Sequence, residues 1–368
     1  MHFNYILAIN PGSTSTKVAV YRGNKSLFLK TIRHSTSDLK PFRTVSDQFE
    51  FRKGLVFNEV IKNSIPLDEI SVVIARGGLL NPIESGVYEV NERMIRDLKS
   101  GVMGEHASNL GGLIAADIAR QLPNAKAYIA DPVVVDELED LARVSGHPDF
   151  NRVSIFHALN QKAIARTYAQ SRGLRYEELN LIIAHLGGGI SVGAHKKGKV
   201  IDVNNALDGD GPFSPERSGS LPAGQLAQLC FESGLTLCDV RKMITGEGGL
   251  MAYLGTKDAH RVEIMAGEGD AKAKLIQDAM AYQISKEIGS MATVLGGQVN
   301  AIILTGGIAN NEYITNFIKD RVNFIAPVLV YPGEDEMRAL ALNGNLLIKG
   351  EIKPKEYTEE NFVQGLKL

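Results

Sequence analysis

The chain has 368 residues, of which 44% are hydrophobic and 22% charged, and its formal net charge is −2 at pH 7. This length suits two domains of roughly 150 to 200 residues each, and the composition is typical of a globular protein. The near-zero net charge gives no indication of a nucleic-acid-binding protein or of a protein that binds anionic membranes.

Three further features predict a cytoplasmic protein. The first five residues, Met1 to Tyr5, lack the basic segment and apolar stretch of a signal peptide, and no apolar run reaches the ~18 residues of a membrane span. Cys230 and Cys238 have no histidine nearby and fit no metal motif. A low cysteine content of this kind is typical of a reducing compartment.

The first 32 residues predict three strands, at 5–9, 17–21 and 26–32, joined by turns at 10–13 and 22–25. A similar pattern returns about 175 residues later, with strands at 181–185, 191–195 and 200–204. The recurrence indicates an internal repeat on the scale of a domain, although two such hairpins can also recur by chance.

The remainder of the chain alternates short apolar strands with helical patterns. Strands are predicted at 71–75, 127–130 and 301–305, and helices at 106–122, 159–171, 271–295 and 336–347. Strands that alternate with helices indicate an α/β fold. We expect the last helix to pack back on the first domain.

Three strands end in turns rich in Gly, Ser and Thr. Their sequences are NPGSTSTK at 10–17, HLGGGIS at 185–191 and TGGIAN at 305–310. Such turns expose backbone N–H groups and hydroxyls without bulk, as a polyphosphate requires. Each turn alone is also compatible with an ordinary surface hairpin, but the three together favour a nucleotide held from both sides of a cleft. The segment GAHKKGKV at 193–200 is not a P-loop, because Val200 replaces the required hydroxyl and no helix follows.

Four side chains are candidates for chemistry by their positions. Arg76 ends an apolar strand, and Arg217 lies in a loop rich in Gly, Ser and Pro, where it could bind a carboxylate or phosphate or be merely solvated. Asp131 follows an apolar strand and suits a metal site, a base or an exposed turn equally. His157 lies between Phe156 and Ala158, so a buried structural histidine is the default interpretation.

Eight segments together resemble the acetate and butyrate kinase family over nearly the whole chain. They are NPGSTSTK at 10–17, RGG at 76–78, DPVVVDEL at 131–138, HALNQKA at 157–163, HLGGGISVG at 185–193, PERSGSLP at 215–222, GTKDAH at 255–260 and TGGIANN at 305–311. The segments RGGL, DPVVVDE and ERSGSLP are similar to the butyrate kinase branch of the family.

The resemblance implies a duplicated actin-like (ribonuclease H-like) α/β ATPase fold with two lobes around a nucleotide cleft. It implies residues 1–150 plus 338–368 for one lobe and 151–337 for the other. The implied activity is reversible transfer of the γ-phosphoryl group of ATP to butanoate or a branched short-chain fatty acid, with Mg²⁺ as cofactor. The implied assembly is at least a homodimer, with no nucleic-acid or membrane partner.

The resemblance also implies residue roles. Mg²⁺ would be held by Asn10 together with Glu336 or Glu334. The phosphates would be bound by residues of the first two turns: Ser13, Ser15, Lys17, Gly187, Gly188 and Gly189. The adenosine would be held by a third group: Asp258, Gly306, Gly307, Ile308, Asn310 and Asn311. The catalytic candidates are Arg217, Arg76, His157, His185 and Asp131.

Two positions depart from the family pattern. Val73 stands where the acetate branch has an arginine, and Arg76 is a candidate to supply the missing charge. His260, followed by Arg261, stands where family members often carry arginine. Since a carboxylate substrate has no proton to remove, we expect Asp131 to orient Mg²⁺-bound water or an arginine rather than to act as a base.

Three alternatives remain open from the sequence. One is an acetate- or propionate-preferring kinase of the same family, although Ala75, a small residue beside Arg76, predicts room for a longer acyl chain. Another is a non-enzymatic actin-like ATP-binding module, which would not need Arg76 and Arg217 beside the γ-phosphate. The third is a sugar kinase, which would need a carboxylate base facing a hydroxyl in a polar pocket. We also expect the two lobes to close on ATP and acid about hinges near 135–155 and 335.

Overall fold

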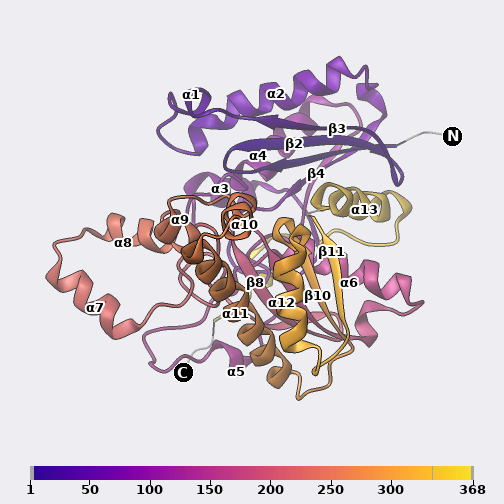
Figure 1. Cartoon of the computed structure of the whole chain (residues 1–368). Coiled ribbons are helices and arrows are strands. Elements are labelled where there is room, and N and C mark those ends of the chain that lie inside the picture. Colours follow the sequence, from indigo (N-terminus) through magenta and orange to yellow (C-terminus); the bar gives the residue numbers. More distant parts are fainter. Residues whose placement is uncertain (1–3, 334, 366–368) are drawn as a thin grey trace. The chain divides into compact units, whose positions relative to one another are not determined.

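The computed structural model describes residues 4–333 and 335–365. The chain divides into two compact units (Figure 1). Within the described residues, unit 1 comprises 4–136, 158–160 and 335–364, and unit 2 comprises 137–157, 161–333 and 365.

Unit 1 is built around a six-stranded sheet with the strand order β3-β2-β1-β4-β6-β5. Its strands are β1 Tyr5–Pro11, β2 Ser15–Arg22, β3 Lys25–Arg33, β4 Ile70–Arg76, β5 Val87–Glu89 and β6 Lys126–Ala130. Its helices are α1 Thr36–Leu39, α2 Phe49–Lys62, α3 Glu92–Ser100, α4 Asn109–Gln121 and α13 Glu336–Lys349. β1 runs antiparallel to β2 and parallel to β4, and β4 runs parallel to β6.

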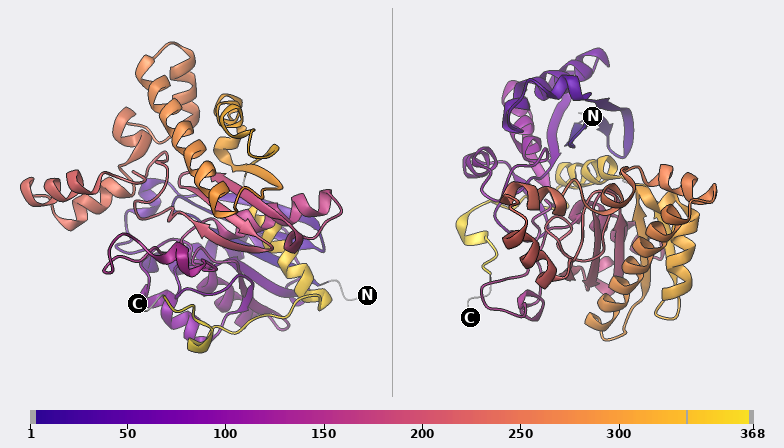
Figure 2. Two further views of the ribbon diagram at one scale, coloured as in Figure 1. Left: turned by 90° about the horizontal axis from the view of Figure 1, so that it is seen from below. Right: turned by 60° about the vertical axis from the view of Figure 1, so that its left-hand side comes forward.

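Helices cover both faces of this sheet (Figure 2), which is why its central strands read as continuous apolar runs. On one face, α13 approaches β1 so closely that a methyl group on Gly344 would lie 2.8 Å from Ile6. On the other face, a methyl group on Gly111 of α4 would lie 3.3 Å from the side chain of Ala75. The last helix therefore packs on the first sheet, as the sequence predicted.

Unit 2 is built around a five-stranded sheet with the order β11-β10-β7-β8-β9. Its strands are β7 Asn180–Leu186, β8 Ile190–Lys196, β9 Lys199–Val203, β10 Ala301–Gly306 and β11 Val328–Pro332. Its helices are α5 Asp140–Arg143, α6 Ala158–Ser171 (first three residues grouped with unit 1), α7 Ala223–Glu232, α8 Leu237–Ile244, α9 Gly249–Leu254, α10 Ala259–Gly267, α11 Ala271–Val294 and α12 Glu312–Val322.

The two sheets repeat one topology. Each begins with an antiparallel three-stranded meander, β1-β2-β3 or β7-β8-β9. Each then extends in parallel from the first strand of its meander, through β4 and β6 or through β10 and β11. This correspondence confirms the internal repeat predicted from the two hairpins.

The sheet of unit 2 separates two apolar cores. Leu181 and Ile183 of β7 pack with Ala165 of α6, whereas Ile182 and Ala184 pack with the helices on the opposite face. Because side chains alternate along a strand, His185 continues the row that faces α6. Ser191, which pairs with His185 across β7 and β8, lies on the same face.

The strands and helices predicted from the sequence are present within a few residues of their expected limits. Several other elements have no counterpart among the predicted ones, and they include α2, α12 and β11. Among the described helices, none is long and apolar enough to cross a lipid bilayer.

Candidate functional site

The first phosphate-type turn joins β1 to β2 and is closed by a hydrogen bond from Gly12 N–H to Ser15 O of 2.8 Å. Within it Ser13 is exposed, and Ser15 and Lys17 are half-buried. The hydroxyls and N–H groups of this turn are therefore available to an anion, as the sequence pattern predicts.

A fully buried arginine, Arg52 of α2, hydrogen-bonds to the backbone of this turn from the protein interior, the side called here the back of the turn. Its guanidinium donates to the carbonyl oxygens of Gly12 at 2.7 Å, Ser13 at 3.2 Å and Ser15 at 3.1 Å. It also donates to Thr16 Oγ1 at 3.2 Å and to Gln48 Oε1 at 2.9 and 2.7 Å. None of these partners is a carboxylate, and burial lowers the pKa of Arg52. Among the described residues no carboxylate pairs with this positive charge, which lies directly behind the turn.

Asn10, Arg76 and Glu336 meet where β1 and β4 end against the start of α13. Asn10 Nδ2 donates to Glu336 Oε2, and Arg76 Nη1 lies 3.2 Å from Glu336 Oε1. Strand alternation explains the meeting, because Asn10 and Arg76 point to the sheet face that α13 covers. The alternative metal residue, Glu334, lies outside the described residues.

The cluster formed by Asn10, Arg76 and Glu336 suits one divalent cation together with phosphate oxygens. Asn10 Oδ1 is buried and has no hydrogen-bond partner within the described part of the chain. An amide oxygen beside a carboxylate is the kind of ligand pair that Mg²⁺ uses when substrate phosphates and water complete its shell. Among the described residues, no group of three or more His, Cys, Asp or Glu side chains could hold a metal without such help.

Asp131 is fixed by the loop that precedes β5. Its Oδ1 accepts from Ser85 Oγ at 2.8 Å and from Gly86 N–H at 2.9 Å, and the residue is 2% exposed. Its φ of +37° is a left-handed conformation that a non-glycine residue adopts only under constraint. The structure therefore makes Asp131 a buried, oriented carboxylate and excludes the exposed-turn interpretation.

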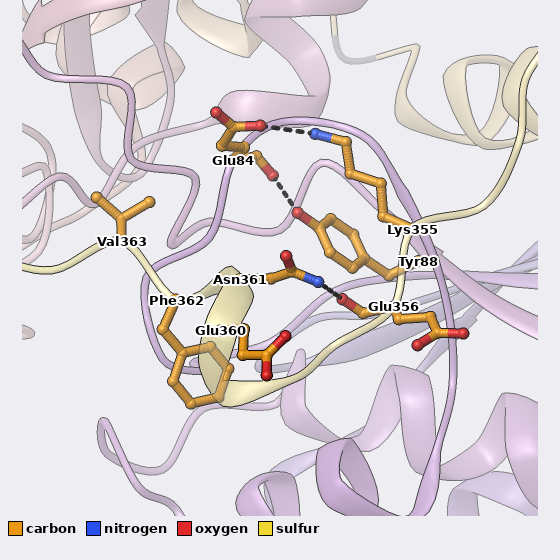
Figure 3. A pocket seen from close by; sticks show the side chains of 8 residues that line it. All are labelled: Glu84, Tyr88, Lys355, Glu356, Glu360, Asn361, Phe362 and Val363. Carbon is orange, nitrogen blue, oxygen red and sulfur yellow. Dashed lines mark hydrogen bonds and ion pairs between the residues drawn. The ribbon is translucent and has the colours of Figure 1, made fainter.

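The C-terminal segment supports this loop beside a cavity of about 710 Å³ (Figure 3). Lys355 Nζ donates to Ser85 O at 2.9 Å and pairs with Glu84 Oε2 at 3.0 Å. The cavity is lined by Glu84, Tyr88, Lys355, Glu356, Glu360, Asn361, Phe362 and Val363. None of the residues that the sequence marked for function lines it.

The second phosphate-type turn joins β7 to β8 and carries Arg217 against its backbone. Gly187 N–H donates to Gly189 O at 3.1 Å, and Ser214 Oγ donates to Gly188 O at 2.6 Å. A methyl group on Gly189 would lie 1.8 Å from Arg217 Nη1, so any side chain there would force the guanidinium to move. Arg217 Nη1 also donates to Ala206 O. The structure thus brings Arg217 onto this turn.

Two histidines stack beside the second turn. The rings of His157, at the N-cap of α6, and His185, at the end of β7, are 3.8 Å apart and nearly parallel at 12°. His157 Nδ1 lies 2.8 Å from Ser191 Oγ. The histidine that the sequence left as a default core residue therefore belongs to the same cluster as the HLG turn.

The predicted adenosine-binding segments surround one cavity of about 530 Å³ in unit 2. It is lined by Lys257, Asp258, Ala259, His260, Glu263, Gly307, Ile308, Asn310 and Asn311. Asp258 caps α10 by accepting from His260 N–H at 3.0 Å, and Asn311 Nδ2 is buried with no partner in the described structure. Gly306 has φ +92° and packs against the backbone of Leu186, which ties this cavity to the end of β7.

Sequence reasoning missed Arg52, and it assigned no role to Ser191, Gln161 or His195 behind the second turn. Ser191, Gly193 and His195 alternate along one predicted strand and so share a face. This pattern could have indicated that Ser191 and His195 act together. Ala75 does not support the expected acyl pocket, because it is fully buried on the face that packs against α4.

Comparisons with known proteins identify the family. Residues 152–326 match the Acetokinase family. The chain is 55% identical to butyrate kinase 1 of Clostridium acetobutylicum over 96% of this chain and 99% of that one. It is 54% identical, with the same coverage, to a probable butyrate kinase of Bacteroides thetaiotaomicron.

Similar solved structures identify the fold. Acetate kinase of Porphyromonas gingivalis has a TM-score of 0.76 at 20% identity and covers 94% of this chain and 100% of its own. Acetate kinase of Entamoeba histolytica has a TM-score of 0.73 at 16% identity, with 95% and 99% covered. The predicted actin-like α/β fold is confirmed. The chain belongs to the acetokinase family.

Proposed function

We propose that this protein is a carboxylate kinase that transfers the γ-phosphoryl group of ATP to a short-chain fatty acid, with butanoate or a branched four-carbon acid preferred. A carboxylate oxygen of the acid would attack the γ-phosphorus while the bond to the β–γ bridging oxygen breaks, giving acyl phosphate and ADP. The observation that carries this proposal is Arg217 lying on Gly189 of the second phosphate-type turn, beside the His157–His185 stack.

The proposed chemistry asks for charge stabilisation rather than for a base. The substrate carboxylate is already a nucleophile at pH 7, and the transferring group spreads negative charge over its equatorial oxygens. Arg217 would bind this charge, and His157 and His185 would donate hydrogen bonds to it. Ser13, Ser15 and Lys17 would bind phosphate from unit 1, and Gly187, Gly188 and Gly189 from unit 2.

Asn10 Oδ1 and Glu336 would hold Mg²⁺, which when bound neutralises phosphate charge. Its partnerless buried oxygen makes Asn10 the better supported of these two ligands. Arg76 pairs with Glu336 and so orients that carboxylate. We propose that Arg76 also attracts the acid substrate, while Asp131 positions cationic groups as a fixed carboxylate.

The adenosine would occupy the 530 Å³ cavity of unit 2. Asn311 Nδ2 is a buried donor able to bind a ring nitrogen or a ribose oxygen. His260 stands at the rim where an arginine was expected, and it is exposed enough to stack on an adenine.

The acid preference rests on the names of the most similar relatives, since the structure offers no support from Ala75. The test is a hydroxylamine trap for acyl phosphate with ATP, Mg²⁺ and straight and branched acids of two to five carbons. Each further buried methylene should raise kcat/KM by roughly fourfold, from ~0.8 kcal/mol of transfer free energy, up to four carbons. Highest kcat/KM for acetate would overturn the preference, and no trapped product with any acid would overturn the kinase.

The same assay separates this proposal from a non-enzymatic ATP-binding module. Such a module would release ADP at a rate independent of added acid and would form no hydroxamate. We propose a cytoplasmic site of action, which the two free cysteines Cys230 and Cys238 support. We also propose a homo-oligomer of at least two chains, which light scattering of the purified protein would measure.

A further inference from the structure

A buried series of hydrogen bonds runs within unit 2 from Tyr176, at the start of the short 3-10 helix η3 (Tyr176–Glu178), to His157. Tyr176 Oη lies 2.6 Å from His195 Nδ1, and His195 Nε2 lies 2.9 Å from Gln161 Oε1. Gln161 Nε2 lies 2.9 Å from Ser191 Oγ, which lies 2.8 Å from His157 Nδ1. His195, Gln161 and Ser191 are completely buried, so these bonds are shielded from bulk solvent.

A backbone carbonyl fixes the direction of the series. Gln161 Nε2 lies 3.0 Å from Ser191 O, which can only accept, so the NH₂ side of the amide faces Ser191. The amide oxygen therefore faces His195, whose Nε2 must carry a proton. His195 Nδ1 is then left as an acceptor for the hydroxyl of Tyr176.

The charge state of His195 agrees with this direction. Burial, followed by the positive charges of Lys162 and Arg166, lowers the pKa of His195 well below its usual value. A neutral imidazole has one donor and one acceptor nitrogen, and the contacts to Gln161 and Tyr176 use one of each. The ring is thus held in a single tautomer.

The hydrogen bonds of Ser191 determine in the same way which nitrogen of His157 carries the proton. Gln161 gives its second amide hydrogen to Ser191 Oγ, and the backbone N–H of His157 also lies 3.4 Å from that oxygen. With these donors around it, the hydroxyl hydrogen of Ser191 is directed to His157 Nδ1. His157 therefore accepts at Nδ1 and carries its proton on Nε2.

We propose that Tyr176, His195, Gln161 and Ser191 are positioning residues that hold His157 as a neutral Nε2–H donor. The proposal rests on the proposed function, in which His157 donates to the transferring phosphoryl group. A neutral donor suits a ring stacked 3.8 Å from His185, because two charged rings at that distance would repel. It also adds a directed hydrogen bond without a further full charge that would bind ground-state ATP as tightly as the transition state.

The sequence makes room for this series at Gly193. A methyl group there would lie 2.7 Å from Gln161 Oε1 and 3.3 Å from His195 Nε2. Glycine between Ser191 and His195 on one strand face lets the amide of Gln161 cross β8 and reach both neighbours. Gly193 thus contributes space rather than a turn.

The test reverses the polarity of one link without changing its shape. In Gln161→Glu a carboxylate replaces the amide, so the Ser191 hydroxyl turns toward residue 161 and no longer donates to His157. Long-range ¹H–¹⁵N spectra of the ¹⁵N-labelled full chain should show His157 protonated on Nε2 in the wild type and on Nδ1, or on both nitrogens, in Gln161→Glu. A His157→Gln spectrum assigns the signals.

Gln170→Glu is the matched control, because it makes the same change on the exposed side of α6. Its tautomer pattern and kinetics should equal those of the wild type. If Gln161→Glu does not fold, Ser191→Ala removes the donor to His157 and should likewise release the ring from the Nε2-protonated form. In either variant kcat should fall by about 10- to 100-fold, as for other partners that orient a functional histidine, with KM for ATP within about twofold.

The possible outcomes test the positioning inference and the catalytic role of His157 separately. A wild-type His157 protonated on Nδ1, or a tautomer that Gln161→Glu and Ser191→Ala both leave unchanged, would overturn the positioning inference. A tautomer that changes as expected while kcat stays at the wild-type value would support the hydrogen-bond series and refute the catalytic role of His157. A rise in KM for ATP with kcat unchanged would mean that His157 binds the ground state and the transition state equally, and would refute the neutral-donor argument.

Discussion

The two phosphate-type turns share one topology, but their arginines contact them in different ways. Arg52 lies behind the first turn, fully buried, with its guanidinium on backbone carbonyls. Arg217 lies against Gly189 of the second turn, and the side chains that bond to each other behind that turn, Gln161 and Ser191, carry no charge. In both units a hydroxyl at the start of the second strand, Thr16 or Ser191, meets a histidine nitrogen at 2.9 or 2.8 Å.

This difference indicates a division of labour between the units. A charge buried behind a turn is fixed by its own hydrogen bonds, so it favours any bound anion equally before and during reaction. A charge that can contact the transferring group acts on negative charge that develops in the transition state. The first turn should therefore govern ATP affinity, and the second turn should govern turnover.

Arg217→Ala is the change with the largest expected effect. Because a stabilising arginine in phosphoryl transfer is worth about 10³ to 10⁵ in rate, kcat should fall by roughly that factor while KM for ATP changes by less than about tenfold. Steady-state kinetics with the hydroxylamine trap measure both constants. Arg217→Lys, which keeps the charge but not the fork, should recover only part of the loss. Unchanged kcat with weaker ATP binding would remove the contrast between the turns.

Arg52→Met should have the opposite signature. Loss of the guanidinium leaves the carbonyls of Gly12 and Ser13 without a donor, which should lower the free energy of unfolding by roughly 2 to 4 kcal/mol. Affinity for ATP should fall more than tenfold while affinity for adenosine stays the same, as isothermal titration would measure. Arg52→Lys should restore part of the ATP affinity. Equal losses for ATP and adenosine would mean that Arg52 acts only on stability.

Gly189→Ala tests whether the space under Arg217 matters. The added methyl collides with the guanidinium, so we expect kcat to fall by about 10- to 100-fold, less than for Arg217→Ala, because a displaced arginine keeps part of its effect. Gly188→Ala is the matched change, since its methyl would meet only Glu216 Oε1 at 3.8 Å. A kcat for Gly189→Ala at or above that of Gly188→Ala would contradict the close approach.

The smallest effect concerns pH. Burial, and then the charge of Arg52, lowers the pKa of His34, whose Nε2 meets Thr16 Oγ1. Between the two pKa values, His34 is protonated in the unfolded chain but neutral in the folded chain. Its contribution to the free energy of unfolding is therefore complete above about pH 6.5 and declines as the pH falls toward the pKa of the folded state. His34→Gln should flatten the dependence of the urea midpoint on pH in this range. A slope equal to that of the wild type would exclude His34 as its source.

Much of the fold could be predicted because strand alternation and glycine turns are local signals. Residues 5–9 and 181–185 are apolar runs that end in Gly- and Ser-rich turns, and both proved to be central strands. The sites in each unit could also be anticipated, because parallel strands bring Asn10 and Arg76 to one sheet edge. The partner Glu336 could be found only through resemblance, since 326 residues separate it from Asn10.

Arg52 and Gln161, which support the two turns, could not be predicted because their roles also depend on contacts with residues distant in the sequence. Arg52 lies in the segment Phe49–Lys62, which contains other charged residues, and nothing local distinguishes a buried arginine from an exposed one. Gln161 likewise reads as an ordinary helical residue of α6. Its role depends on Gly193 and His195, which are more than 30 residues away and reach it only through the register of β7 with β8.

The most direct test of the account compares hydrogen exchange at the two turns in Arg52→Met and Gln161→Glu. Deuterium uptake, read by mass spectrometry with peptides of β4 and β10 as internal references, should rise at residues 10–17 in Arg52→Met and stay at the wild-type level at 185–193. Gln161→Glu should show the reverse pattern. Equal increases at both turns in either variant would contradict the claim that each turn is held separately by its own unit.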